Sequence, residues 1–562
     1  MKIKLIAGLS VVALISSSLV ACGGTPSTNT SENPADFFEK PTEGERAFTS
    51  VSTFDEPVEF HTAAQKEFLE YREKPYEQLT ANEMKQWAPN NSSTDYSTPL
   101  PIEIEFAQDS ADVEKYTLEI SRDYKFENDV ISMDVAASAN KFSVYNLWSG
   151  TDYYYKVKAI YGEDDYAVSA TNKLTTVEGI RNLKVDGMYN VRDMGGKKTV
   201  DGGYIRQGLL YRTAAMDDNQ SGSIITEAGK PVMLNDLKVK TEIELRGGSN
   251  GLDKGEAKNR TNSVLGDSVN YQFKGMAYSG GKNLLFRNVE LVRQVFDVLG
   301  DEENYPVFYH CRIGTDRTGL IALLVNALCG LDIQMLYQDY LLSNFAKIAK
   351  NFGCTDNGED TVYNYIQEIR EFPGEKLQNS AYNFLLAAGV PAEKLDTVIR
   401  VLTTEGSVTG NDASKTHVAN NTDMEDLGSA TRVLKKNLRQ PDEAVKFAAA
   451  GDGIKYSFTS DKEFTCNLFA NLMSNYTTGT LADNVSVKLN GTEIDVEATS
   501  LATSAIGFDS NIECWIPAKL ASITVPAGNN TIELTAKSNF GGKGLQFTQF
   551  AFSGMSVSAN IE

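Results

Sequence analysis

The residues with the greatest capacity for chemistry lie in one short segment that contains a cysteine and an arginine. Cys311 and Arg317 are separated by five residues. The apolar run 306–309 comes before them and predicts a buried strand, and the mostly apolar run 319–328 predicts a buried helix that ends at Gly330. The cysteine and the arginine therefore belong to a tight loop between the end of a strand and the start of a helix.

A loop in this position is suited to an anion. Successive backbone N–H groups point inward, and the helix N-terminus adds a positive dipole end. The same field stabilises the thiolate of Cys311, which is a strong nucleophile and divides the reaction into two steps through a covalent intermediate. The planar fork of Arg317 matches two oxygens of a phosphate. The segment predicts transfer of a phosphoryl group to Cys311.

Neighbouring residues have expected roles with alternatives. His310 is expected to orient the loop through a backbone hydrogen bond, and a purely structural role is equally open. Thr318 is expected to hydrogen-bond the sulfur and help it leave in the second step, or else only to cap the following helix. Asp316 is close enough to the phosphoryl group to act as an acid. The residues expected to surround the phosphate are Arg312, Ile313, Gly314 and Thr315.

The run His-Cys-x5-Arg-Thr at 310–318 is the signature of the protein tyrosine phosphatase superfamily. The segments 189–196 (YNVRDMGG), 211–214, 240–246 and 339–344 resemble, in the same order, the bacterial tyrosine-protein phosphatase family that has an Asn-x-Arg-Asp-x-Gly-Gly motif. This resemblance covers about 230 residues of the chain. It implies that Arg192 and Asp193 line the active site, although the motif taken alone is also compatible with a plain turn.

The chain departs from the family pattern at two positions. Thr315 stands where the family commonly has a lysine, so one cation beside the phosphate is missing and the case for multiply phosphorylated inositol lipids is weaker. Glu244 stands where the family has an aspartate, which places the carboxylate on a longer arm. Three carboxylates are candidates for the general acid: Asp316 first, then Glu244, then Asp193.

The rest of the chain is expected to position and export this site. It has 562 residues, 41% of them hydrophobic, which is enough for several domains. A basic start and a short apolar run predict a signal peptide over 1–22. The sequence Leu-Val-Ala-Cys-Gly-Gly that ends this segment resembles a bacterial lipobox, with Cys22 as the lipidated residue. A plain secretory signal is the alternative. The expected location is the cell surface outside the cytoplasm, with a lipid anchor in the membrane.

The predicted architecture is multidomain, with an α/β phosphatase domain between two β-sandwich modules. The segment 23–95 is predicted as a tether followed by a helical segment. Alternating strands over 96–176 resemble a fibronectin type III module. Alternating strands and helices predict the phosphatase domain over 177–405, and a small, polar linker follows at 406–432.

Strand patterns return over 433–562, where Ala-Gly-x-Asn-x-Ile resembles family 6 and 35 carbohydrate-binding modules of jelly-roll fold. Trp515 is either a sugar-stacking platform or, as we favour, a core residue. Cys466 and Cys514 either form a disulfide or, slightly favoured, are two separate buried thiols. The resemblance makes polysaccharide a candidate partner.

Charge and composition limit the remaining functions. The formal charge is −22, which argues against nucleic acid as a partner, so a phosphate site here needs its own local positive field. No HxxxH, HExxH or CxxC spacing is present, so no metal and no cofactor are expected. The expected function is a protein tyrosine phosphatase, of possible dual specificity, acting on a phosphorylated protein or a small phosphomonoester. The alternatives are an inositol phosphate or phosphoinositide phosphatase and a carbohydrate-binding surface protein with a vestigial phosphatase domain.

Overall fold

The computed structural model describes most of the chain within one compact unit, Lys40–Glu562. The described residues are 48, 50–89, 94–107, 112–247, 260–278, 284–347, 351–355, 362–404, 415–435, 439–476, 479–497 and 514–554. The signal peptide predicted for 1–22, with its lipidation site Cys22, lies outside the described residues. So does the predicted tether at the start of 23–95.

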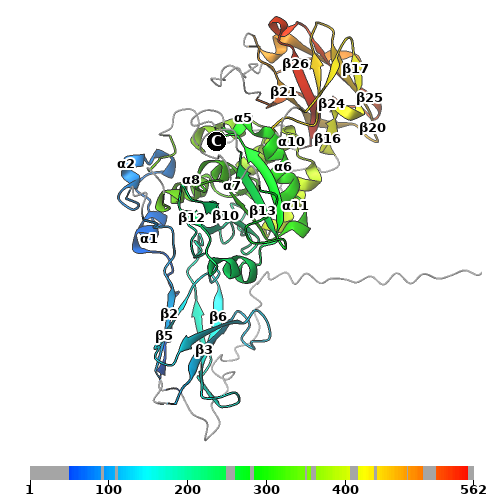
Figure 1. Cartoon of the computed structure of the whole chain (residues 1–562). Coiled ribbons are helices and arrows are strands. Elements are labelled where there is room, and N and C mark those ends of the chain that lie inside the picture. Colours follow the sequence, from blue (N-terminus) through cyan, green and yellow to red (C-terminus); the bar gives the residue numbers. More distant parts are fainter. Residues whose placement is uncertain are drawn as a thin grey trace, which may run out of the picture. The chain divides into compact units, whose positions relative to one another are not determined.

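The first module consists of two antiparallel sheets that enclose their own apolar core (Figure 1). Period-two alternation explains it, because in β6 buried residues alternate with half-buried or exposed ones along nine positions. Sheet one has the order β1-β2-β5, and sheet two has the order β4-β3-β6-β7 with β8 also paired to β6. The strands are β1 (Ser50–Val51), β2 (Ile102–Ala107), β3 (Lys115–Ser121), β4 (Ile131–Ala136), β5 (Lys141–Val144), β6 (Asp152–Ile160), β7 (Tyr166–Val168) and β8 (Asn172–Thr175).

This module begins earlier in the chain than the sequence pattern indicated. Strand β1 pairs with β2 although it lies within the segment predicted as tether and helix. Two short helices, α1 (Ala63–Leu69) and α2 (Ala81–Met84), come between β1 and β2, and each begins with a threonine capping box. Their buried side chains, including Phe68 and Trp87, belong to the core of the phosphatase domain. Assignment to the fibronectin type III family stays a prediction.

The central domain is built on a five-stranded sheet of order β14-β13-β15-β10-β9. All pairs are parallel except β9–β10. Helix α7 packs against β10 and β15, and α6 packs against β14. The strands are β9 (Arg192–Asp193), β10 (Leu210–Thr213), β13 (Thr241–Arg246), β14 (Asn270–Met276) and β15 (Val307–His310), with the small hairpin β11 (Asp217–Asp218) and β12 (Ser223–Ile224). The helices are α3 (Gly229–Pro231), α5 (Leu284–Arg287), α6 (Val289–Leu299), α7 (Asp316–Leu328), α8 (Ile333–Leu341), α9 (Val362–Arg370), α10 (Leu377–Ala387) and α11 (Ala392–Leu402).

The C-terminal module is a second sandwich with a separate apolar core. One sheet contains β18-β19-β26-β21-β24 with β16 paired to β26, and the other has the order β17-β20-β25-β22-β23. The elements are β16 (His417–Asn420), β17 (Glu425–Leu427), β18 (Thr431–Leu434), β19 (Glu443–Phe447), β20 (Gly453–Ser460), β21 (Phe464–Met473), α12 (Leu481–Asn484), β22 (Val485–Leu489), β23 (Thr492–Ile494), β24 (Ile516–Val525), β25 (Gly528–Ala536) and β26 (Leu545–Ser553).

One expectation for this region is corrected. The segment 406–432 is not a linker throughout, because β16 and β17 within it are strands of the sandwich. Their polar sequence fits strands at the edge of a sheet, which sequence composition does not distinguish from a loop. No disulfide joins Cys466 to Cys514, and both are buried thiols, as the favoured interpretation of the sequence had it. Trp515 is 2% exposed and belongs to the core, not to a surface platform.

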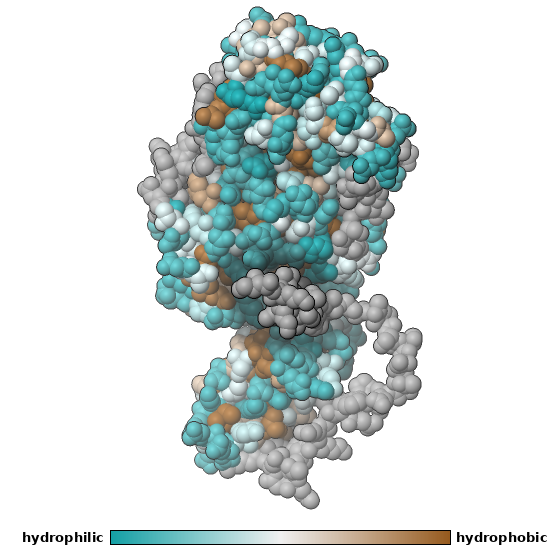
Figure 2. Space-filling model, turned by 90° about the vertical axis from the view of Figure 1, so that its right-hand side faces the viewer, coloured by the Kyte–Doolittle hydropathy of each residue, from teal (hydrophilic) through white to brown (hydrophobic). Residues whose placement is uncertain are grey.

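The described part of the chain includes no helix that is both long enough and apolar enough to span a bilayer. Figure 2 shows a mainly hydrophilic face on which apolar residues are scattered. Large hydrophobic side chains are nevertheless exposed at single positions, such as Leu434 at 70% and Tyr166 at 54%. Isolated apolar residues of this kind are ordinary on protein surfaces.

Candidate active site

The segment from Cys311 to Arg317 lies at the carboxyl end of β15, between its neighbours β13 and β10 (Figure 1). This is the edge of a parallel sheet at which open α/β folds bind ligands. Cys311 directly follows β15 and is 2% exposed. Helix α7 begins at Asp316, so Arg317 and Thr318 lie in its first turn. The strand–loop–helix order predicted from the sequence is confirmed.

Four consecutive carbonyl groups of the loop are held from outside by hydrogen-bond donors. The donors come from three stretches of the domain, because Arg212 and Ala215 both lie in or just after the end of β10. The loop is thus fixed on several sides. The bonds are His310 Nδ1 to Cys311 O (3.1 Å), Ala215 N to Arg312 O (3.0 Å), Asn190 Nδ2 to Ile313 O (3.0 Å) and Arg212 Nη2 to Gly314 O (2.8 Å).

These bonds determine where the loop N–H groups point. In a trans peptide the C=O and the following N–H face opposite ways. Carbonyls drawn outward at 311–314 therefore turn the N–H groups of 312–315 toward the inside of the loop. In the described part of the chain no group accepts a hydrogen bond from these four N–H groups. The loop is a nest of convergent donors of the kind that binds a phosphate.

Gly314 is required by this conformation. Its φ is +73°, in the left-handed region, and a Cβ atom on it would lie 2.7 Å from the carbonyl oxygen of Thr213. Asn190 also has a positive φ, +57°, which asparagine tolerates better than most residues. That backbone turn belongs to the residue whose side chain holds Ile313. Asn190 thus binds the Ile313 carbonyl, and Gly314 is the next residue in the chain.

The helix side of the loop supplies a guanidinium and two hydroxyls. Arg317 is 4% exposed, and its Cζ lies 5.4 Å from the ring centroid of Tyr278. Thr315 and Thr318 are almost completely buried, and their Oγ1 atoms have no hydrogen-bond partner among the described residues. A buried hydroxyl without a partner is costly unless a ligand or the thiolate satisfies it.

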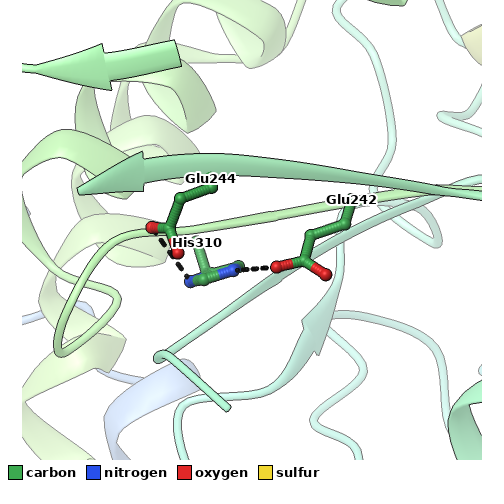
Figure 3. A group of neighbouring side chains, drawn as sticks. All are labelled: Glu242, Glu244 and His310. Atoms are coloured by element: carbon green, nitrogen blue, oxygen red, sulfur yellow. Dashed lines mark hydrogen bonds and ion pairs between the residues drawn. The ribbon is translucent and has the colours of Figure 1, made fainter. Parts of the chain in front are cut away.

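His310 lies between two carboxylates on the neighbouring strand β13 (Figure 3). Its Nε2 is 3.0 Å from Glu242 Oε1, and its Nδ1 bonds to the Cys311 carbonyl and lies 3.8 Å from Glu244 Oε1. Because a carbonyl only accepts and Glu242 is ionised, both ring nitrogens must carry protons. Burial lowers the pKa of His310, but the charges of Glu244 and Glu242 outweigh burial and raise the pKa above its ordinary value. The ring is therefore held as an imidazolium.

The same three side chains form a group whose ligand atoms lie within 4.8 Å of one another, as a metal site would require. Their charges are already balanced by arginines, however. Arg246 binds Glu244 through Nε at 2.9 Å and Nη2 at 2.6 Å, and Arg260 binds Glu242 at 2.8 Å. A divalent cation would have to displace one of these arginines. The arrangement fits an ion-pair network better than a metal site.

The loop is joined to this network on its other side as well. Arg312 Nε is 2.9 Å from Asp218 Oδ2 in β11. The adjacent Asp217 binds Arg246 at 2.7 Å and Arg260 at 3.0 Å. The ion pairs thus run from Arg312 through β11 and β13 and return to the loop at the Cys311 carbonyl. Sequence patterns did not identify Asp217, Asp218, Glu242 or Arg260 as part of the site.

The structure does not bring Arg192 and Asp193 to the inner side of the loop, where they were expected. Arg192 is fully buried, donating to Asp339 O at 3.0 Å and Ser343 Oγ at 3.3 Å. Asp193 is fully buried in an ion pair with Arg181 and also accepts from the N–H groups of Gly195 and Gly208, each at 2.7 Å. Arg192 reaches the loop only through Asn190, and the printed partners of Asp193 all lie outside the loop. A motif alone does not distinguish such a buried position from the inner surface of the loop.

The three acid candidates differ in accessibility. Glu244 and Asp193 are 0% exposed and bound to arginines. Asp316 is half-buried at the first position of α7. Only Asp316 among the three is both in the loop segment and open to solvent. Asn190 and Arg212 belong to the recognised motifs but were assigned no individual role, and they hold two of the loop carbonyls.

Comparison with known proteins agrees with this geometry. Residues 183–402 match the model of the tyrosine phosphatase family. The matched region contains the loop, all four carbonyl donors and the His310 network. It supports a tyrosine-phosphatase-like function for this domain. No curated protein sequence is significantly similar to the chain.

Solved structures resemble a smaller part of the chain. An exo-β-1,3-galactanase from Phanerochaete chrysosporium is 14% identical over 25% of this chain and 29% of its own, with a TM-score of 0.18. A family 35 carbohydrate-binding module from Clostridium thermocellum is 16% identical over 24% of this chain and 96% of its own, with a TM-score of 0.19. A CBM36-1 domain of a multidomain xylanase from the hindgut metagenome of Trinervitermes trinervoides is 15% identical over 25% of this chain and 98% of its own, with a TM-score of 0.19. No functional conclusion rests on likeness at this level.

Proposed function

We propose that the chain is an exported, cysteine-dependent protein tyrosine phosphatase that hydrolyses phosphomonoesters through a phosphocysteine intermediate. The observation that carries the proposal is the loop itself. Four outward carbonyls and four inward N–H groups surround a position next to Cys311. That arrangement binds an oxyanion and aligns it with the sulfur.

In the first step the Cys311 thiolate attacks phosphorus, and the S–P bond forms as the bond from phosphorus to the ester oxygen breaks. The carboxylic acid of Asp316 gives its proton to the departing oxygen. The inward N–H groups of 312–315 and the fork of Arg317 stabilise the equatorial oxygens in the transition state.

In the second step water attacks phosphorus, and the carboxylate of Asp316 takes a proton from that water. The S–P bond breaks, and the electron pair returns to sulfur as the thiolate. The Thr318 hydroxyl, which has no described partner, is positioned in the first turn of α7 to donate to this sulfur. Inorganic phosphate leaves, and the enzyme is restored.

The substrate class follows from the charges beside the loop. Thr315 supplies a hydroxyl where a lysine would supply a second cation, which suits a single phosphate better than a polyphosphate. The ring of Tyr278 over Arg317 adds an aromatic surface at the same place. An aryl phosphate such as phosphotyrosine therefore fits this site better than an inositol polyphosphate.

The test is a substrate panel on the purified chain without its first 22 residues. Phosphotyrosine peptides, phosphoserine peptides, inositol hexakisphosphate and a phosphoinositide are compared by kcat/KM. We expect the phosphotyrosine peptides to give the highest value. A higher value for the inositol compounds would replace the proposal with the inositol phosphate alternative.

Export and anchoring at Cys22 belong to the same proposal and rest on the N-terminal sequence. Metabolic labelling with a radioactive fatty acid tests them, because a Cys22→Ala chain would no longer incorporate the label. Polysaccharide binding by the C-terminal module is a further proposal, and it must use residues other than the buried Trp515. Pull-down on insoluble polysaccharides with Cys311→Ser protein tests it.

A further inference from the structure

A group of fully buried charges lies directly behind the loop and is not balanced within itself. Three cations, Arg192, Arg212 and Lys197, surround one carboxylate, Asp339. The distances to the Asp339 oxygens are 2.6 Å from Arg212 Nη1 and 3.6 Å from both Arg192 Nε and Lys197 Nζ. Each cation is at most 1% exposed. Two positive charges are left over, and we name this group the Asp339 cluster.

No other described carboxylate removes the surplus. Asp193 is close enough to favour the charged form of Lys197, but it is already paired with Arg181. The remaining side-chain contacts are Asn190, Ser343 and Asn326, and the backbone contacts are the carbonyls of Gly314 and Asp339. All of these groups are neutral.

The other charges around the loop cancel. Arg312 is paired with Asp218. In the His310 network three cations, including His310 itself, face the three carboxylates Glu242, Glu244 and Asp217. In the reactive state that we propose, the Cys311 thiolate and Arg317 are opposite in sign, and Asp316 is a neutral acid. The surplus in the Asp339 cluster is thus the net charge of the immediate surroundings of the loop.

Without a bound anion the surplus positive charge destabilises the folded protein. The lowered pKa values of Arg192 and Lys197 reflect this destabilisation. Burial and the charge of Arg212 lower the pKa of Arg192 to about 9. Burial lowers the pKa of Lys197, against the attraction of Asp339. Uncompensated buried charges of this kind persist in proteins where they serve another group.

The cluster also touches the loop. Arg212 binds Asp339 through Nη1 and the Gly314 carbonyl through Nη2, so one guanidinium joins the two. Asn190 receives a hydrogen bond from Arg192 and gives one to the Ile313 carbonyl. Two of the four outward carbonyls therefore depend on residues bound to this cluster.

We infer that the Asp339 cluster is the charge reservoir of the active site, with Arg212, Arg192 and Lys197 as positioning residues whose surplus charge is neutralised by the bound phosphate dianion. This rests on the proposed function and explains how a chain of formal charge −22 maintains an anion site. The potential acts through the low-dielectric interior, where a unit charge has a longer reach than in water.

Two substitutions separate charge from geometry. Lys197→Met removes one cation that touches no loop carbonyl, since its hydrogen bond goes to Asn326. Arg212→Met removes both a cation and the hydrogen bond to Gly314. The double variant Arg181→Met with Asp193→Asn is the matched control, because it deletes an equally buried ion pair nearby without changing the net charge.

The measurement is tungstate binding by calorimetry, together with the thermal midpoint with and without tungstate. We expect tungstate to bind roughly tenfold more weakly to Lys197→Met and more weakly still to Arg212→Met, with the control unchanged. In tungstate-free buffer Lys197→Met should unfold no earlier than the natural chain, because it loses an unbalanced buried charge. If Lys197 had only a structural role, Lys197→Met would unfold at a lower temperature and would bind tungstate as well as the natural chain does.

The outcomes distinguish the two claims. If the natural chain binds no tungstate, the proposed function fails together with this inference. If the natural chain binds tungstate and Lys197→Met binds it equally well, the charge reservoir is refuted and the proposed function stands. An equal loss in the control variant would also refute the reservoir.

Discussion

Arg212 and Gly314 are joined by a hydrogen bond of 2.8 Å from a guanidinium to a loop carbonyl, although they are 102 residues apart in the chain. Strands β10 and β15 lie side by side in parallel register, which brings the end of β10 to the loop that follows β15. The bond turns the next peptide N–H toward the inside of the loop. The phosphate nest is therefore a product of tertiary contacts and is not a property of the loop sequence alone.

Replacing the nucleophile separates binding from chemistry. Cys311→Ser should lower turnover about 10⁴-fold or more. The serine hydroxyl, unlike a thiol, does not ionise near neutral pH and is therefore a much weaker nucleophile. Tungstate binding should remain, since the inward N–H groups are backbone atoms. Turnover is followed with a phosphotyrosine peptide, and binding is followed by calorimetry. Substantial residual turnover would mean that Cys311 is not the nucleophile.

Removal of divalent cations should have little effect on the natural chain. The carboxylates of the Glu242, Glu244 and His310 group are bound by Arg246 and Arg260, so no cation is needed to balance them. Activity is measured after dialysis against EDTA and after adding back magnesium, calcium or zinc. Loss of activity that one of these ions restores would show that this group is a metal site after all.

The sequence predicts the strand–loop–helix course of the segment better than its surroundings, for a physical reason. The residues from Cys311 to Thr318 are consecutive in the chain, so their motif can be recognised from the sequence alone. Asp218, Glu242 and Arg260 act through ion pairs with partners 18 to 94 residues away, and no local pattern marks such pairs. Arg192 and Asp193 were recognised by motif, but a motif does not say whether a residue lines the inside of a loop or is buried away from it.

In the two β-sandwich modules, too, the sequence predicts local structure better than contacts between distant segments. Alternation in segments such as β6 predicts the strands of both sandwiches. It did not show that β1 pairs with β2 across the helices α1 and α2, because strand pairing over such an insertion depends on tertiary packing. The polar strands β16 and β17 were mistaken for a linker for the same reason.

The His310 imidazolium makes stability depend on pH. Its folded pKa is raised above the ordinary value of about 6.5. A raised folded pKa contributes stability that is complete below about pH 6.5 and is lost as the pH rises through the folded value. Urea unfolding of the natural chain and of His310→Asn should therefore differ by roughly 2 kcal/mol at pH 6 and by less at pH 9. If the free energies of unfolding of the two proteins differ by the same amount at every pH, His310 is neutral in the folded protein.

Leaving-group dependence identifies the general acid. Asp316→Asn should slow hydrolysis of phenyl phosphate about 10²- to 10⁴-fold, because that leaving group needs a proton, and should slow a nitrophenyl ester much less. Glu244→Gln is the comparison, since Glu244 is fully buried and bound to Arg246. Glu244→Gln should slow the hydrolysis of both substrates by the same factor, because it disturbs the loop and not the proton transfer. Equal slowing of both substrates by Asp316→Asn would remove it from the acid role.

Cys466 and Cys514 of the C-terminal module should not form a disulfide with each other. Cys466 and Cys514 are buried and unbridged, and burial raises the pKa of Cys466 to about 12. We expect both to resist alkylation in the folded protein and to be alkylated after denaturation without a reductant. Mass spectrometry of the peptides measures this. A peptide pair that separates only after reduction would show a disulfide.

The Thr318 hydroxyl is expected to act in the second step. It is fully buried in the first turn of α7, and no described residue accepts or donates a hydrogen bond to it. A hydrogen bond to the sulfur as it regains negative charge contributes about 1.5–3 kcal/mol, which is roughly a 10- to 100-fold effect on that step. Thr318→Ala should therefore show a burst of phenol release followed by slow turnover, and phosphocysteine should accumulate and be trapped by acid quench.

Thr318→Ser keeps the hydroxyl and is the matched control, so it should turn over nearly as fast as the natural chain. A helix cap would give a different pattern, because loss of a cap lowers the thermal midpoint without trapping an intermediate. If Thr318→Ala is less stable yet shows no burst and no trapped phosphocysteine, the hydroxyl supports the helix and not the departing sulfur.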